Sequence, residues 1–300
     1  MKPRVLFIGC VDFSRALLKR ILENRVVEIC GVVTKKRSPF NSDHCDLSRT
    51  VEGFGIPALF TEHGDQKEIL SCIERTAPQA IYCFGWSHML GPALLSAVPL
   101  GCVGYHPALL PFNRGRHPVI WALALGLPKT GSTFFRMDEG ADAGDVLSQR
   151  VVAIDEEDDA SSLYRKLQTV AERQTEEIDT MIASGVLRGT PQALEAGNTW
   201  RKRTKSDGRI DFRMPSSGIR NLIRALRPPY PGAHLEYNGE EYVVGRADVL
   251  SDCFDGAEYA EPGKILEIRG NTIIVKSGDG IVALSEHTLP DTLCKGEYFV

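Results

Sequence analysis

Strand-like and helix-like segments alternate through the first half of the chain, and this alternation is the feature that most restricts its fold. Residues 5–8 and 27–33 are short apolar runs typical of strands, whereas residues 13–22 place leucine and isoleucine at helical spacing. A second helix-like segment, residues 67–75, precedes the apolar run 80–84. Strands that alternate with helices form a mostly parallel sheet with helices on both faces. The sequence therefore predicts an α/β fold with a Rossmann-like sheet.

An apolar run that ends in a histidine continues this pattern. Residues 100–105 are flanked by prolines, which predicts a buried strand that ends at His106. In open α/β sheets, ligands bind at the carboxyl ends of the strands. A second loop, acidic and rich in glycine, begins at Met137 and contains Asp142, 142 − 106 = 36 residues after the histidine. An imidazole and a carboxylate in two such loops are groups that proton transfer at an active site uses.

The motifs around these two residues resemble those of the folate-dependent formyltransferases, which move a formyl group from N10-formyltetrahydrofolate to an amine. The chain has H-P-A-L-L-P from His106, followed by N-R-G-R and later by A-D-A-G-D. The resemblance covers nearly the whole chain and includes residues 83–87, 208–212 and 229–233. The last two segments are most similar to members that act on amino groups of nucleotide-linked sugars. The resemblance also implies that the second domain is a barrel of the OB type.

The resemblance assigns catalytic roles to two residues. In the family an asparagine, a histidine and an aspartate carry the chemistry, and this chain supplies the last two as His106 and Asp142. The imidazole would stabilise the oxyanion or take the proton of the amine, and the carboxylate would support the imidazole. The asparagine is replaced by Gly104. Because one missing donor at an oxyanion can cost roughly 10²–10³ in rate, another donor is expected: a backbone N–H, a water or cationic His106.

The resemblance also implies where the two substrates bind. The folate head is expected between residues 84–90 and 137–142, largely on backbone groups. The expected folate-binding residues are Phe84, Gly85, Trp86, Ser87, Met89, Leu90, Met137, Gly140, Ala141 and Asp142. The expected contacts of the acceptor are Gly104, Tyr105, Pro107, Arg114 and Arg116. The two arginines are suited to a phosphate, although surface charge explains them equally well.

The second half of the chain has a different character. A long helix is predicted over residues 159–185, and the following stretch is rich in glycine, proline and charge, which is typical of a connection between domains. Several short strands then follow with close turns, such as Asn-Gly at Asn238, and indicate a small barrel. We therefore predict a catalytic domain at residues 1–187, a linker at 188–207 and an OB-like domain at 208–300.

Composition limits the remaining possibilities. The chain has 35 basic and 39 acidic residues and a net charge of −4, which argues against a nucleic-acid partner. Its eight cysteines form no C-x-x-C pair, so no metal site is expected, and they are predicted to be buried, reduced thiols. No apolar run approaches the roughly 20 residues of a membrane span, and the first run is too short for a signal peptide. A cytoplasmic location without membrane partners is expected.

The resemblance implies an N-formyltransferase for a UDP- or dTDP-linked amino sugar, in cell-surface glycan synthesis, with N10-formyltetrahydrofolate as donor. A homodimer is compatible with this prediction. Three alternatives stay open. A methionyl-tRNA formyltransferase would share the donor and domain plan but must hold a polyanion. A formyltransferase for a hydroxyornithine-type amine, or a folate- or nucleotide-binding protein that has lost catalysis, would also fit.

Overall fold

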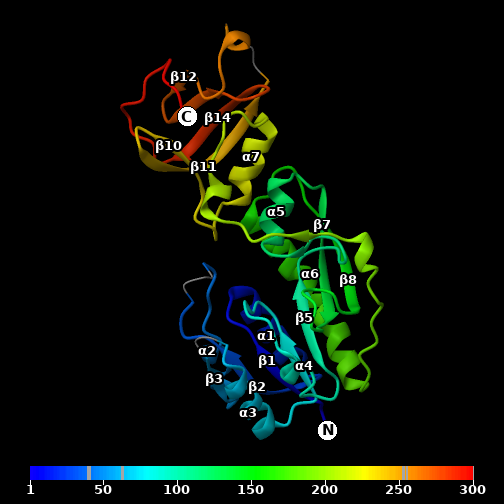
Figure 1. The fold of residues 1–300 in the computed structure, drawn as a ribbon. Helices are drawn as coiled ribbons and strands as arrows, with labels where there is room; N and C mark the ends of the chain where they lie inside the picture. The colour runs from blue at the N-terminus through cyan, green and yellow to red at the C-terminus, as the bar shows by residue number, and fades with distance from the viewer. Residues whose placement is uncertain (39–41, 62–63, 252–253, 255, 300) are drawn as a thin grey trace. The chain divides into compact units, whose positions relative to one another are not determined.

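The computed structural model describes residues 1–38, 42–61, 64–251, 254 and 256–299. Within them the chain forms sheets of seven, five and two strands (Figure 1). The chain divides into two compact units, each made of several segments. Unit 1 comprises Met1–Pro118, Thr130–Val152 and Arg165–Arg201, and unit 2 comprises Val119–Lys129, Ala153–Tyr164 and Lys202–Val300. The domain boundaries expected at residues 187 and 208 stay predictions.

The seven-stranded sheet is the framework of unit 1, and its strand order is β3-β2-β1-β4-β5-β7-β8. Its strands are β1 (Arg4–Ile8), β2 (Glu28–Thr34), β3 (Ala58–Phe60), β4 (Ala80–Cys83), β5 (Cys102–His106), β7 (Lys129–Arg136) and β8 (Val146–Ala153). The first five are parallel to their neighbours, and β7 runs antiparallel to β5. The prediction of a mostly parallel sheet is confirmed.

Helices cover both faces of this sheet. They are α1 (Asp12–Asn24), α2 (Ser48–Val51), α3 (Gln66–Thr76), α4 (Pro92–Leu95) and α6 (Ala160–Ala183). Successive side chains of a strand point to opposite faces. Val5 and Phe7 of β1 therefore pack in one core cluster with side chains of α1 and α6. Leu6 and Ile8 pack in a second cluster with side chains of α3 and α4. Among the described residues, no helix combines the length and apolar character that crossing a membrane requires.

Unit 2 contains an antiparallel sheet with the order β10-β11-β14-β13-β12. Its strands are β10 (Ala233–Tyr237), β11 (Glu240–Leu250), β12 (Ile265–Arg269), β13 (Thr272–Lys276) and β14 (Ile281–His287). The expected turn at Asn238 joins the first two, and positive φ angles of 52° and 76° at Asn238 and Gly239 match a two-residue hairpin turn. A second, five-stranded antiparallel domain agrees with the predicted fold class.

The remaining elements are short. They are α5 (Pro118–Ala124), α7 (Ser216–Ala225), β6 (Arg114–Gly115), β9 (Thr199–Trp200), and the 3₁₀ turns η1 (Glu52–Phe54), η2 (Leu194–Ala196), η3 (Lys205–Gly208) and η4 (Ala257–Tyr259). The strands β6 and β9 pair with each other in parallel.

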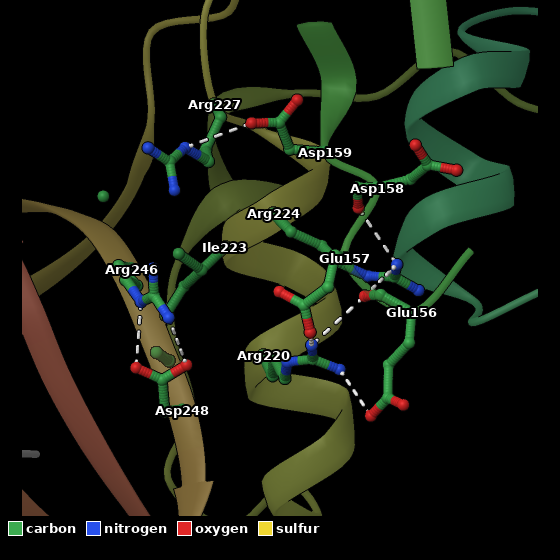
Figure 2. A pocket seen from close by; sticks show the side chains of 12 residues that line it. Glu156, Glu157, Asp158, Asp159, Arg220, Ile223, Arg224, Arg227, Arg246 and Asp248 are labelled. Atoms are coloured by element: carbon green, nitrogen blue, oxygen red, sulfur yellow. Dashed lines mark hydrogen bonds and ion pairs between the residues drawn. The ribbon is translucent and has the colours of Figure 1, made fainter. Parts of the chain in front are cut away.

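Arginines of α7 anchor the segment that leads into α6, residues 153–164 (Figure 2). Arg220 lies 2.9 Å from a carboxylate oxygen of Glu157. Arg224 donates to three backbone carbonyls of this segment, including that of Asp158 at 3.0 Å. Burial lowers the pKa of Arg224. The segment is thus part of unit 2 because its backbone oxygens are bonded to α7.

The cysteines follow the expectation in part. Seven are free: Cys10, Cys30, Cys72, Cys83 and Cys102 are buried, Cys45 is half-buried and Cys294 is exposed. Burial raises the pKa of the Cys10 thiol to about 11, which keeps it protonated. The prediction of a buried thiol is wrong for Cys294, and Cys253 lies outside the described residues.

A buried carboxylate connects α6 to the centre of the unit 1 sheet. Asp179 is fully buried and accepts a hydrogen bond of 2.7 Å from the hydroxyl of Tyr82 on β4. Burial raises the pKa of Asp179 from 3.8 to about 6. A carboxyl group whose pKa is higher in the folded state lowers stability as pH rises. Its ionisation therefore reduces the stability of the fold progressively between about pH 4 and pH 6.

We expect Asp179→Asn to stabilise the protein at pH 8 and to have little effect near pH 4. The amide oxygen can still accept from Tyr82, and the side chain carries no charge to desolvate. The free energy of unfolding at pH 8 should rise by up to about 3 kcal/mol. Urea unfolding at the two pH values measures this difference. An equal effect at both would show that the ionisation of Asp179 does not limit stability.

Candidate active site

The loops that follow β1, β4 and β5 leave the same edge of the unit 1 sheet. Strand β1 pairs with β2 on one side and with β4 on the other, so the order of strands reverses there. In open α/β sheets, ligands bind at such a reversal, outside the carboxyl ends of the strands. Residues 84–90 follow β4, and His106 is the last residue of β5. Two of the segments singled out in the sequence therefore lie at the edge where a ligand is expected.

His106 is held between two oxygen acceptors. The residue is only 5% exposed. Its Nδ1 lies 3.5 Å from Oδ2 of Asp142, and its Nε2 lies 2.8 Å from the backbone oxygen of Asn113. A neutral imidazole has one N–H and can donate to only one of them, whereas the imidazolium donates to both. Each ring nitrogen of His106 therefore faces an oxygen acceptor.

Asp142 is held in a left-handed turn between β7 and β8. Its φ angle is 55°, a conformation that aspartate tolerates better than most residues. Besides facing His106, its Oδ2 accepts a hydrogen bond of 2.9 Å from the backbone N–H of Gly115. A Cβ at Gly144 would lie 1.7 Å from the backbone oxygen of Arg136, so only glycine fits there. The turn therefore directs the carboxylate towards both His106 and the loop around Gly115.

The structure gives a physical reason for the glycine at position 104. Gly104 of β5 pairs with Phe135 of β7. A Cβ at Gly104 would lie 2.7 Å from Cζ of Phe135 and 2.9 Å from Cγ of Met137. The space that an asparagine side chain would need is thus filled by an aromatic ring and a thioether stem. The expectation that another group supplies the oxyanion donor stays a prediction.

The predicted folate-binding residues differ in what their side chains do. Phe84 and Leu90 are buried in the core, so only their backbone groups could reach a ligand. Trp86 is half-buried, with its ring 5.1 Å from the ammonium of Lys35. Met89 is 56% exposed. Gly85, Ser87, Met137, Gly140 and Ala141 lie in the loops after β4 and β7. Their role in folate binding stays a prediction.

The predicted acceptor-binding residues are not all on one side of the sheet. Tyr105 packs on Phe13, with ring centroids 4.4 Å apart, and so faces away from His106. Pro107 follows His106 directly. Arg114 is half-buried and donates to the backbone oxygen of Leu194 at 3.2 Å, whereas Arg116 is exposed. The loop that carries both arginines is therefore bonded to residues near position 194.

Two features of this region were missed in the sequence. Lys35, at the carboxyl end of β2, is only 3% exposed, and its ammonium lies 2.7 Å from Nε2 of His88. A lysine directly after an apolar strand was the signal available for it. Gln192 donates to the backbone oxygens of Asp142 and Gly144 at 3.0 and 2.5 Å. No sequence signal marks Gln192, because it lies in a stretch with the composition of a linker.

Comparison with known proteins identifies the family of this chain. Residues 1–177 match the family described as Formyl transferase, and residues 202–293 match its C-terminal domain. The chain belongs to the formyltransferase family. This membership confirms the predicted class of enzyme, a folate-dependent formyltransferase.

Similar proteins include formyltransferases with different acceptors. The chain is 32% identical over 292 residues to the methionyl-tRNA formyltransferase of Agathobacter rectalis, covering 94% of this chain and 91% of that protein. The fold is similar to an N-formyltransferase from Helicobacter canadensis, solved with folinic acid and dTDP-3-aminofucose (TM-score 0.71, 15% identity, 95% and 99% of the chains). It is also similar to HypX of Aquifex aeolicus (TM-score 0.68, 19% identity, 95% of this chain). The matched region is 45% of the length of the HypX chain.

We expect His106→Asn to abolish formyl transfer while the melting temperature changes little. A carboxamide can donate a hydrogen bond but cannot carry the proton, and general acid–base groups contribute about 10²–10⁴-fold. Asp142→Asn should be nearly as damaging, since it removes the charge beside the imidazole. The matched control is His287→Asn in unit 2, where Nε2 also faces a backbone oxygen, 3.1 Å away on Asn271. Wild-type kcat in His106→Asn would exclude this histidine from the chemistry.

We expect Gly104→Asn to destabilise unit 1, and Phe135→Leu to restore part of the loss. Forcing a side chain against Phe135 should cost about 1–3 kcal/mol. A smaller residue at 135 provides room, so the two changes should be strongly coupled. A double-mutant cycle on the free energy of unfolding measures the coupling. Strict additivity would mean that the ring of Phe135 is not what excludes a side chain at 104.

Proposed function

We propose that this formyltransferase transfers the formyl group of N10-formyltetrahydrofolate to the amino group of a nucleotide-linked amino sugar. The observation that carries the chemistry is the His106–Asp142 contact of 3.5 Å at the ligand-binding edge of the sheet. The amine nitrogen attacks the formyl carbon, and an oxyanion forms. The bond from the formyl carbon to N10 of the folate then breaks. The imidazolium of His106 gives its proton to N10 as this bond breaks, and the neutral imidazole then takes up the proton lost by the amine.

His106 and Asp142 divide this work between them. The imidazolium places a positive charge beside the carbon that gains negative charge on its oxygen, and such preorganised charge is often the largest single contribution to catalysis. Asp142 places a carboxylate oxygen 3.5 Å from Nδ1 of the imidazole, and the same oxygen accepts from the backbone N–H of Gly115 in the loop after His106. The folate would lie between residues 84–90 and 137–142, whose exposed positions include Met89, Gly140 and Ala141.

The charge of the C-terminal part supports a small acceptor rather than tRNA. Residues 202–300 contain 13 Lys and Arg residues and 15 Asp and Glu residues, a net charge of −2. Six of the arginines form ion pairs with carboxylates: Arg209, Arg213, Arg220, Arg227, Arg246 and Arg269. Binding a polyanion requires Lys and Arg side chains that neutralise phosphates instead.

Arg114 supports a phosphate in the acceptor. Among the described residues its guanidinium forms no ion pair with a carboxylate, and its buried Nε lacks a hydrogen-bond partner. The backbone N–H of the next residue, Gly115, donates a hydrogen bond to Asp142. Arg114 is therefore adjacent in sequence to a residue that contacts the catalytic pair. A diphosphate would supply the oxygens that this guanidinium fork is suited to bind. Exposed Arg116 could add a second contact.

Methionyl-tRNA is the second candidate acceptor, because the relative from Agathobacter rectalis is 32% identical over most of both chains. That enzyme and a sugar formyltransferase share the donor, so only the acceptor distinguishes them.

We expect the protein to formylate at least one member of a panel of UDP- and dTDP-linked amino sugars and to leave initiator methionyl-tRNA unmodified. Mass spectrometry detects the product, and folinic acid at millimolar concentration should raise the melting temperature if the donor is a folate. Formyl transfer to tRNA with strongly salt-dependent binding would establish the second candidate. The absence of any shift with folinic acid would contradict the donor as well.

A further inference from the structure

Residues 190–200, which we call the site strap, run beside both loops that carry the catalytic pair. At one end, Thr190 and Val146 exchange two backbone hydrogen bonds of 2.8 and 2.9 Å. At the other end, β9 of the strap pairs with β6 of the loop after His106. The strap belongs to unit 1 together with these loops. It is therefore bonded at one end to the start of β8 and at the other end to the loop after His106, although its composition resembles that of a linker.

The side chain of Gln192 joins the strap to the turn that contains Asp142. Its Nε2 donates to the backbone oxygens of Asp142 and Gly144, at 3.0 and 2.5 Å. The turn between them has the left-handed φ of 55° at Asp142. The Oε1 of Gln192 is buried and has no partner among the described residues, so the contribution of this side chain comes from its N–H groups. Gln192 thus holds the carbonyls on either side of Ala143, in the turn that directs the carboxylate.

The side chain of Asn198 has the corresponding position on the histidine side. Its Oδ1 accepts from the backbone N–H of Asn113 at 2.9 Å, and its backbone oxygen accepts from Arg114 at 3.1 Å. Asn113 has a left-handed φ of 62°, and its own carbonyl oxygen is the acceptor 2.8 Å from Nε2 of His106. The side chain and the backbone oxygen of Asn198 therefore bond the peptide units on both sides of Asn113, whose carbonyl faces the imidazole.

We propose that Gln192 and Asn198 are positioning residues for formyl transfer. Gln192 acts on Asp142 and Asn198 acts on His106, each through one backbone segment and without touching a substrate. The strap brings both contacts together and so sets the separation of imidazole and carboxylate. The inference rests on the roles proposed for His106 and Asp142. It places residues that position the catalytic pair beyond residue 177, where the match to the Formyl transferase family ends.

Catalytic groups must be held within about 0.5 Å of their productive geometry, and a displacement of about 1 Å can cost roughly 10²-fold in rate. Gln192→Met keeps the length of the side chain but removes both donors. We expect it to lower kcat by about 10- to 100-fold while KM for donor and acceptor changes little, because neither substrate loses a contact. The melting temperature should fall only slightly, since the backbone pairing of the strap remains.

Gln174→Met is the matched control. Gln174 is 1% exposed, and its Nε2 also donates two hydrogen bonds, to the backbone oxygen of Ser132 at 3.1 Å and to the hydroxyl of Ser148 at 2.9 Å. We expect Gln174→Met to lower the melting temperature more than Gln192→Met does. It should leave kcat near the wild-type value. The pH profile of kcat should shift in Gln192→Met and not in Gln174→Met, because only the former changes the surroundings of the His106–Asp142 pair.

Asn198 provides a test by rescue. Asn198→Ala removes the acceptor for Asn113 and should lower kcat, whereas Asn198→Asp keeps an oxygen in the same place and should recover most of it. Three results would overturn the proposal: wild-type kcat in Gln192→Met, an equal loss of kcat in Gln174→Met, or equal activity of the two Asn198 variants. His106→Asn, assayed alongside, separates this failure from one of the proposed function, because activity in that variant would remove the pair that the strap is inferred to position.

Discussion

One contact between two loops holds the site together: the carboxylate of Asp142 faces the imidazole of His106 at 3.5 Å. The histidine ends a buried strand, and the aspartate lies in a glycine-containing turn beyond the antiparallel strand β7. The same carboxylate oxygen accepts from Gly115, so one atom joins the end of β5, the loop after it and the turn before β8. A buried imidazole without this partner would face only the carbonyl of Asn113. The loops and the strap are arranged around that oxygen.

Much of the fold could be predicted, because apolar periodicity reports burial directly. Buried parallel strands such as residues 5–8 are continuous apolar runs, and the Asn-Gly pair at Asn238 marks a hairpin. His106 and Asp142 could be singled out because each lies in a recognisable motif at a strand end. For the seven-stranded and the five-stranded sheet, local pattern and observed structure agree.

The contacts of Gln192 and the reason for Gly104 could not be predicted. Gln192 reaches a carbonyl 50 residues earlier in the chain, and that contact depends on the course of two loops without any periodicity. Gly104 could be noticed as a departure, but the ring that fills its space comes from Phe135 on a neighbouring strand. Register between strands distant in sequence decides such contacts, and a single sequence carries no record of it. Tyr105 illustrates the same limit, since the ring on which it packs belongs to Phe13, which lies far from it in the sequence.

The packing at Gly104 also restricts how this site can change by single substitutions. An asparagine that arrives first at 104 meets the ring of Phe135 at 2.7 Å, and a smaller residue that arrives first at 135 leaves a cavity beside β5. Either order passes through a less stable intermediate. The two positions are therefore expected to change as a pair, and an ancestor or descendant with a carboxamide at 104 should carry a smaller side chain at 135. Because of this steric contact in the sheet, each single substitution lowers the stability of the fold, and only the two together give the alternative form of the active site.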